Sequence, residues 1–502
     1  MDQKIVKNKG VCFAGYPDVK MLNLVLNSKK GIKQMKLVKH LLFGDYIKLE
    51  FKNGKPVKKT IDGQEYVYGR ARGMSGYVPV NNILANRILE VNFIDVGQGD
   101  GCHIVTPEDK HFLIDAGASN NMFRFLSWRF NLRRAKARIP PFDVVISHSD
   151  LDHYYGFNAI FKASGNSREF AINKIYHNGM IEASGSGVDS LGTIKDKQIT
   201  GLCLTNAQYK KRVKGLTKKG RFIEMLENSN APKEALYKGY GSIYKMNGMN
   251  LEVLAPVHDK AGGVAALPVL GNKGVTKNGH SVVLKLHYGK LRIILGGDLN
   301  SVSEDYLIEK YSGVAFGKLR KERLQKNLSA TRAREIDSKI NTAISKARNV
   351  FECDIAKSCH HGSPDFTHEF LKVLNPIVTV ISSGDDEPHC HPRPDTLGTI
   401  GKHSRGERSL IFSTELARSG LEFLDIGKIL AERQKAGLVS TKIKERVVTR
   451  YGMINVRSDG ERVVIAQMLE RNSPRGNWDI HTLVWNNDKN EFEYLDYLKR
   501  IK

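Results

Sequence analysis

Residues 147–153 read Ser-His-Ser-Asp-Leu-Asp-His (SHSDLDH) and follow directly on the apolar run of residues 143–146. Two histidines and two aspartates within this short stretch give a high density of metal-ligating side chains. Residues 154–164 have a helical pattern, so the cluster is predicted to lie where a buried strand ends and a helix begins. Functional groups often gather at such strand ends. The stretch therefore predicts a metal site.

The spacing within this stretch suits two cations. His148 and Asp150 can both face one ion from an extended loop, while Asp152 and His153 can serve a second ion at the helix start. Asp298 follows the apolar run LRIIL, and its two carboxylate oxygens are suited to bridging the ions. We therefore expect two divalent ions. The carboxylate of Asp150 makes Mn²⁺ competitive with Zn²⁺, because oxygen ligands favour harder ions.

Five segments, taken in chain order, resemble the motifs of the metallo-β-lactamase fold. The DVGQGD and HHGS elements, and His-x-Asp-x-Asp-His in place of the commoner His-x-His-x-Asp-His, are similar to the soluble hydrolase domain of ComEC-type DNA-uptake competence proteins. The resemblance covers roughly residues 88–470 and implies a four-layer αββα fold of the α/β class. The segments that carry it are FIDVGQGD (93–100), FLIDAG (112–117), SHSDLDH (147–153), GGD (296–298) and HHGS (360–363).

The resemblance also implies roles for single residues. It makes Asp298 the bridging ligand and His360 the last ligand, with His361 as the alternative, and it places His280 at the third motif, where ComEC-like chains usually carry another residue. Asp115, His361 and Ser363 are expected to support the ligands. Asp152 and His391 are expected to act in catalysis, His391 by positioning phosphate or protonating the leaving oxygen.

Some of these residues also have ordinary structural interpretations. Taken alone, Asp152 could cap a helix and Asp115 could be a buried hydrogen-bonding residue at a strand end. Cys390, next to His391, could suggest a zinc thiolate, but no second cysteine pairs with it. For the whole cluster these interpretations are weak, because close carboxylates repel unless a cation lies between them.

The chain is long enough for several domains. We predict a small all-β barrel over residues 1–86, because the ending YVYGR followed by GMSGYVP resembles bacterial SH3-like domains. Its tyrosines could instead be core residues. The hydrolase domain is predicted over residues 87–470 and a C-terminal strand extension over 471–502. Basic inserts are expected near residues 185–245, 311–350 and 420–447, the last with a helix at 425–447.

The charge balance favours a polyanionic partner. The chain has 78 Lys and Arg against 53 Asp and Glu, a net charge of +25, and binding to phosphates releases counterions. An inert, solvated basic surface is the alternative. The basic residues expected to contact nucleic acid are Lys210, Lys211, Arg212, Lys218, Lys219 and Arg221.

These observations predict a cytoplasmic, metal-dependent phosphodiesterase. DNA is the expected substrate, attacked by a water that two metal ions activate, and a role as a defence effector would suit a nuclease without an import channel. No membrane segment or secretory leader is evident, and the six cysteines lack a disulfide pattern. The alternatives are a hydrolase of a small phosphoester or nucleotide, and a regulatory binding protein in which the SH3-like domain docks a protein partner.

Overall fold

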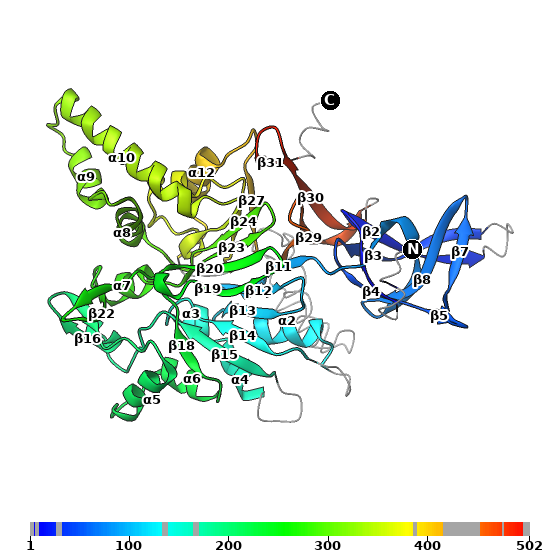
Figure 1. Cartoon of the computed structure of the whole chain (residues 1–502), viewed down its shortest axis with the longest axis horizontal. Coiled ribbons are helices and arrows are strands. Elements are labelled where there is room, and N and C mark those ends of the chain that lie inside the picture. The colour runs from blue at the N-terminus through cyan, green and yellow to red at the C-terminus, as the bar shows by residue number, and fades with distance from the viewer. Residues whose placement is uncertain are drawn as a thin grey trace, which may run out of the picture. The chain divides into compact units, whose positions relative to one another are not determined.

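The computed structural model describes residues 5, 10–26, 33–132, 139–163, 170–384, 389–414, 452–473 and 476–494 (Figure 1). The chain forms two compact units. The smaller unit comprises residues 1–91, 104–110 and 455–502, and the larger unit comprises residues 92–103 and 111–454. The helix predicted at 425–447 and the basic insert at 420–447 lie outside the described residues.

The N-terminal part of the smaller unit is built from strands. Val67 and Gly69 are buried while their neighbours along the strand are more exposed, the alternation expected of a half-buried strand. The buried side chains, among them Met21, Leu41 and Val78, form one apolar core. The paired strands are β10 (Ile83–Leu84), β1 (Val11–Ala14), β4 (Tyr46–Leu49), β8 (Gln64–Ala71), β9 (Met74–Pro79), β2 (Asp18–Leu26) and β3 (Lys33–Leu42), with β7 (Lys58–Ile61) beside β8.

The C-terminal strands belong to the same unit. β29 (Arg462–Ser473), β30 (Gly476–Asn486) and β31 (Glu491–Tyr494) pair antiparallel. His40 of β3 accepts a hydrogen bond from the backbone of Asn477 at 3.1 Å, which ties β30 to the N-terminal strands. The domain boundaries expected near residues 86 and 470, and the SH3-like identity of the N-terminal strands, stay predictions.

Four neighbouring strands in the first sheet of the larger unit run parallel. β13 (His111–Ala116), β14 (Phe142–Val145), β15 (Ile172–His177) and β18 (Lys233–Ala235) pair in that order. β13 and β14 are buried along their whole length, as expected of parallel strands covered on both faces. The helices whose apolar residues pack in the same core are α2 (Asn121–Arg129), α4 (Phe157–Ala163), α5 (Asn206–Lys214) and α6 (Arg221–Glu227).

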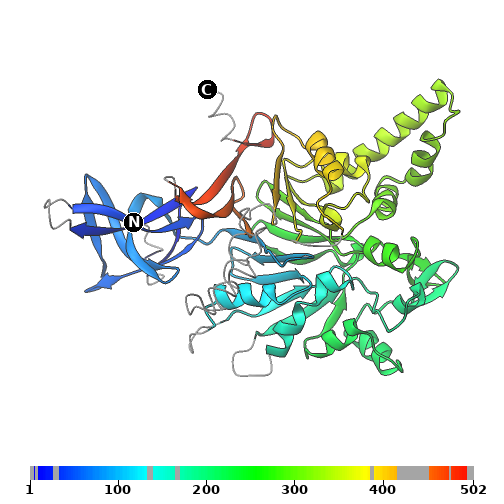
Figure 2. The same ribbon diagram turned by 180° about the vertical axis from the view of Figure 1, so that it is seen from behind.

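A second, mixed sheet carries its own helices. Its strands, in order, are β19 (Ser242–Met246), β20 (Met249–Ala255), β23 (Val283–Tyr288), β24 (Leu291–Leu295), β25 (Ile355–Lys357), β26 (Val378–Ile381) and β27 (Leu410–Ser413). The helices that pack with it are α8 (Ser301–Ser312), α9 (Phe316–Arg323), α10 (Ala330–Phe351) and α11 (His368–Leu374). Phe112 of β13 and Tyr244 of β19 meet edge to face, 5.9 Å between ring centroids. Two sheets with helices outside them, visible from both sides in Figures 1 and 2, agree with the predicted mixed α/β architecture.

Two of the basic inserts are helical. Residues 185–245 contain α5 and α6, and residues 311–350 contain α9 and α10. α10 buries a stripe that runs from Ile336 to Phe351 at intervals of three and four residues, so this helix is anchored by its apolar face. Among the described residues, no helix is both long enough and apolar enough to cross a bilayer.

The candidate site lies where several strands of both sheets end. β24, β25 and β26 are parallel to one another, so the loops after them start at the same edge of the second sheet. Residues 296–298, 358–361 and 382–384 follow these strands directly. The loop after β14, residues 146–150, comes from the first sheet, and Val282 donates a backbone hydrogen bond to Ser147 across the two sheets at 2.9 Å.

Candidate metal centre

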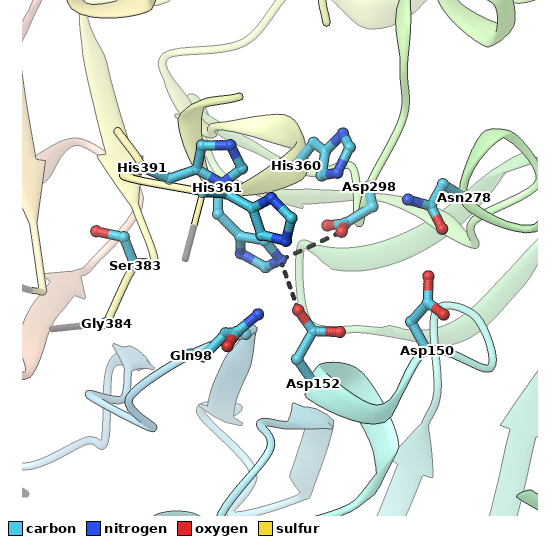
Figure 3. Close-up of a pocket in the computed structure, with 12 residues that line it drawn as sticks. Gln98, Asp150, Asp152, Asn278, Asp298, His360, His361, Ser383, Gly384 and His391 are labelled. Atoms are coloured by element: carbon cyan, nitrogen blue, oxygen red, sulfur yellow. Dashed lines mark ion pairs between the residues drawn. The ribbon is translucent and has the colours of Figure 1, made fainter. Parts of the chain in front are cut away.

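Four side chains from three loops converge on one point. Asp152 and His153 lie on the short helix α3 (Leu151–Tyr154), Asp298 follows β24 and His361 follows β25. Nε2 of His153 lies 3.1 Å from Oδ2 of Asp298 and 3.3 Å from Nε2 of His361. Nε2 of His361 lies 3.2 Å from Oδ2 of Asp298 and 3.5 Å from Oδ2 of Asp152 (Figure 3). We call these four residues the ligand cluster.

Most of these separations are those expected between ligands of one metal ion. Nitrogen and oxygen ligands at about 2.0–2.1 Å from Zn²⁺ lie roughly 3.4 Å from one another in a regular tetrahedron. The four separations above are 3.1–3.5 Å, and Nε2 of His153 is 3.9 Å from the other oxygen of Asp152. His153, His361 and Asp298 therefore place their ligand atoms 3.1–3.3 Å from one another, as ligands on one divalent ion would lie. Asp152, His153 and His361 also form a group that could hold an ion.

Buried hydrogen bonds orient both imidazoles. Nδ1 of His153 lies 2.8 Å from Oδ2 of Asp115, which also accepts a hydrogen bond from the Ser147 hydroxyl at 2.7 Å. Nδ1 of His361 lies 3.0 Å from the carbonyl oxygen of Ser382 and 3.2 Å from Oδ1 of Asp100. With an acceptor at each Nδ1, the Nε2 lone pairs face the cluster, which is the arrangement that metal-ligating histidines require. Asp115 is thus positioned to orient His153, and its role as a support for a metal ligand stays a prediction.

The cluster attracts positive charge. Burial lowers the pKa of His153, but Asp298 and Asp115 outweigh it and raise that pKa well above its ordinary value. Burial also lowers the pKa of His361, but Asp298 and Asp100 outweigh burial and raise that pKa well above its ordinary value. Burial raises the pKa of Asp298, and the two histidines reverse this and hold it well below its usual range. A site that holds protons this strongly also favours a cation in their place.

Lys357 and Asp100 complete the inner wall of the site. The Lys357 ammonium contacts the Asp100 carboxylate, lies 3.1 Å from the carbonyl oxygen of Gly297 and 3.8 Å from Oδ1 of Asp298. Sequence reasoning missed both residues. Asp100 is the last residue of the DVGQGD motif, and this position was a signal that could have found it. Lys357 is the last residue of β25 and belongs to none of the five motifs, so it carried no comparable signal in the sequence.

The DVGQGD loop packs tightly on α3. Gly99 has a φ of +103°, and a Cβ there would lie 1.7 Å from the carbonyl oxygen of Asp152. The backbone of Asp100 donates to that same oxygen at 3.2 Å. Only glycine allows this approach. The packing of the loop on α3 therefore helps to fix the position of Asp152.

His148 and Asp150 lie beside the ligand cluster but bond to each other and to protein groups. Nε2 of His148 is 3.3 Å from Oδ2 of Asp150, and its Nδ1 is 3.0 Å from the Ser147 hydroxyl. The ammonium of Lys277 contacts the other oxygen of Asp150. Burial raises the pKa of Asp150, and His148 and Lys277 together lower it to about 2, so this carboxylate is charged.

The structure does not bring His280 into the cluster. Its Nε2 lies 2.8 Å from the carbonyl oxygen of Pro268, its ring meets Tyr306 edge to face, and burial lowers its pKa to about 4. Ser281, the next residue, faces the site instead, with its hydroxyl 3.3 Å from Nδ1 of His148.

The two adjacent histidines after β25 exchange the roles expected of them. His361 is in the ligand cluster, while His360 lines the pocket above it (Figure 3). Both have left-handed backbone conformations, with φ of 49° and 55°, so the chain turns sharply here. Such strained residues are common at functional sites. Ser363 touches none of the cluster; its hydroxyl accepts from the backbone of Asp365 at 3.2 Å and shapes the loop.

The ligand cluster opens into a pocket of about 230 Å³. Asp152 and His391, the two residues expected to act in catalysis, both line it. The His391 ring lies 5.9 Å from that of His360 and is stacked on His389 at 5.6 Å. His360, His361 and His391 lie on one side of the pocket, opposite Gln98 and Asp150 (Figure 3).

The basic residues expected to bind nucleic acid differ in their surroundings. Lys210, Lys211 and Lys218 are exposed. The Arg212 guanidinium donates to the carbonyl oxygens of Ile181 and Ser190, and Lys219 pairs with Glu227 at 2.8 Å. Arg221 is exposed at the start of α6. Arg212 and Lys219 thus serve the fold at least in part.

Comparisons with known proteins agree with this class of site. Residues 102–186, which include the SHSDLDH stretch, match the family model of the Metallo-beta-lactamase superfamily. A crystal structure from Parabacteroides distasonis, described as a "putative metal-dependent hydrolase", aligns with 72% of this chain and 97% of its own at 10% identity and a TM-score of 0.27, a likeness too low to support an argument. No curated protein matches the chain.

Proposed function

We propose that the protein is a metal-dependent phosphodiesterase whose substrate is DNA. The observation that carries the proposal is the ligand cluster, in which the ligand atoms of His153, His361 and Asp298 lie 3.1–3.3 Å from one another. The superfamily match supports a metal-dependent hydrolase. Zn²⁺ and Mn²⁺ are the proposed ions, because the cluster combines two imidazoles with two carboxylates.

The residues around the cluster suit the chemistry of a phosphodiester. A divalent ion bound there would act as a Lewis acid toward the phosphate. Lys357 adds a buried positive charge beside Asp298 and Asp100, which favours an anionic substrate next to these carboxylates. His391 on the pocket wall is proposed to hold a phosphate oxygen or to donate a proton to the leaving oxygen.

The choice of nucleic acid rests on charge. The net charge of +25 favours a polyanion. The exposed lysines of α5 and of the segment after it are proposed to contact the phosphate backbone. DNA is proposed because the DVGQGD and HHGS motifs resemble those of DNA-uptake proteins. The proposed cytoplasmic setting and the role as a defence effector rest on the sequence alone, and RNA is an outcome of the test below.

The test is hydrolysis by the purified protein. Labelled plasmid, linear DNA and RNA are incubated with Mn²⁺, Zn²⁺, Mg²⁺ or EDTA, beside an Asp152→Ala variant as the matched control. We expect cleavage of DNA with Mn²⁺ or Zn²⁺, and none with EDTA or in the variant. Cleavage that persists equally in EDTA would contradict a metal-dependent mechanism.

A second candidate is a hydrolase of a small phosphoester or nucleotide. The modest pocket of about 230 Å³ favours it, because such a volume suits a compact ligand. Hydrolysis of nucleotides without any cleavage of polymers would support this candidate. In either case residues 1–86 are proposed to be an SH3-like module that docks a protein partner. Its half-buried Tyr68 and Tyr77 rings, 4.9 Å apart, are a candidate contact.

A further inference from the structure

Lys277 places a fixed positive charge beside the ligand cluster. It lies on α7 (Lys273–Gly279), and its side chain is 10% exposed. The ammonium contacts Asp150 and lies 3.3 Å from Oε2 of Glu182. Glu182 is itself held by the Ser149 hydroxyl at 2.5 Å and by Lys273 at 2.7 Å. Lys277 is therefore clamped between two carboxylates.

Both oxygens of Asp150 are taken by groups of the protein. Oδ1 contacts Lys277, and Oδ2 is 3.3 Å from Nε2 of His148. The Asn278 side chain can form hydrogen bonds when its amide nitrogen faces Asp150. In that orientation the nitrogen donates to Oδ2 of Asp150 at 2.6 Å. A cation at the position that the sequence predicts for His148 and Asp150 would have to displace these partners.

His280, which the sequence predicts as a further ligand at that position, does not reach it. His280 is turned to Pro268, and the Ser281 hydroxyl donates to the carbonyl oxygen of Asn278 at 2.8 Å. The same hydroxyl accepts a hydrogen bond from the backbone of Asp298 at 3.1 Å. His148, His153 and Asp298 place ligand atoms within 4.8 Å of one another. An ion among them would meet Asp150 only beside the Lys277 ammonium, which repels a second cation.

We propose that the centre holds one divalent ion, in the ligand cluster, and that Lys277 supplies a permanent positive charge in place of the second ion expected from the sequence. This deepens the proposed function, because it rests on the same metal site but on no particular substrate. One positive charge beside Asp150 is then present at any metal concentration.

Metal content tests the proposal without reference to activity. The full-length protein is loaded with Mn²⁺, dialysed and measured by elemental analysis, and we expect about one ion per chain. Its electron paramagnetic resonance spectrum should show isolated Mn²⁺ and not an exchange-coupled pair. About two ions per chain, or a coupled spectrum, would overturn the proposal.

Variants separate Lys277 from the rest of the site. Lys277→Met should raise the content to about two ions per chain, because it frees Asp150 and removes the repulsion. Lys273→Met is the matched control, since Lys273 pairs with the same Glu182 without contacting Asp150, and it should leave the content unchanged. Circular dichroism verifies that each variant folds.

The remaining outcomes distinguish the two proposals. His148→Ala should keep the bound ion, whereas Asp152→Ala should lose it. Loss of the ion from both variants would overturn the single-ion arrangement. This comparison does not depend on whether Lys277→Met folds. A folded Lys277→Met that still binds one ion would overturn the role of Lys277. A protein that binds one ion but cleaves no phosphodiester would contradict the proposed function and leave this inference standing.

Discussion

Nδ1 of His153 lies 2.8 Å from Oδ2 of Asp115, and Asp115 holds a left-handed conformation with a φ of 56°. The backbone and hydroxyl of Ser147 donate to the same carboxylate at 2.8 and 2.7 Å. Three donors thus fix a carboxylate whose remaining task is to orient a cluster histidine. Asp115 therefore combines a left-handed backbone conformation with bonds that all point toward the site, as strained residues at functional sites often do.

Asp115→Asn should weaken metal binding by about 10- to 100-fold, because an amide orients His153 less well and lowers its basicity. Titration of Zn²⁺ against a chelator measures the change. Asp196→Asn is the control, since Asp196 is also left-handed (φ 48°) but exposed. Equal affinities of wild type and Asp115→Asn would show that Asp115 does not support the metal.

His361→Ala should abolish metal binding, whereas His360→Ala should retain it. Of these two histidines, it is His361 that places a nitrogen inside the ligand cluster, at 3.2 Å from Asp298 and 3.5 Å from Asp152. Elemental analysis after dialysis measures the bound ion, and the two variants serve as each other's control. The reverse result would restore the assignment made from the sequence.

Asp298→Asn should reduce activity far more than His280→Ala, because Asp298 contacts both cluster histidines and His280 contacts none. His280→Ala should instead destabilise the fold by about 2–3 kcal/mol, since it removes a buried ring and leaves the Pro268 carbonyl unpaired. Denaturant unfolding and a phosphodiesterase assay separate the effects. Similar losses of activity in both variants would mean that the third motif has been misassigned here.

These outcomes show what the sequence could and could not specify. The density of ligands in SHSDLDH and the apolar runs before it predicted functional groups at strand ends, and the structure brings Asp152, His153 and Asp298 together. The choice between His360 and His361 depends on two left-handed backbone angles that no residue pattern encodes. The contacts of Lys277 with Asp150 and of Lys357 with Asp100 join residues over a hundred positions apart, and a lone lysine carries no signal of such a partner.

Glu304 gives a prediction about stability and pH. It is buried on α8 and accepts a hydrogen bond from the backbone of Thr367 at 2.5 Å. Burial raises its pKa from 4.5 to about 8. Since the folded state then binds a proton more tightly than the unfolded state, the stabilisation is complete below pH 4.5 and is lost as the pH rises through 8.

Glu304→Gln should flatten this dependence, because the amide keeps an acceptor for Thr367 and does not ionise. At pH 9 the variant should be more stable than wild type by on the order of 3–5 kcal/mol, with a much smaller difference at pH 4.5. Chemical denaturation across the pH series measures it. Glu309→Gln, at an exposed position on the same helix, is the control. Parallel pH profiles for wild type and Glu304→Gln would show that Glu304 ionises in the folded protein as it does in water.

The last prediction concerns the basic insert and separates binding from chemistry. Lys210, Lys211 and Lys218 are exposed, whereas Arg212 and Lys219 are held by internal bonds. Each phosphate contact adds about −0.9 to the slope of log affinity against log salt on duplex DNA. Changing the three exposed lysines to Gln should therefore flatten this slope and weaken binding to all sequences alike, while hydrolysis of a small chromogenic phosphodiester stays the same.

The control changes Lys20, Lys52 and Lys55, three exposed lysines of the smaller unit, to Gln and removes the same charge. Binding to a fluorescent duplex over a salt series measures all three proteins. If the insert variant keeps the wild-type slope, α5 and the segment after it do not contact nucleic acid, and hydrolysis of a small phosphoester becomes the better explanation of the site.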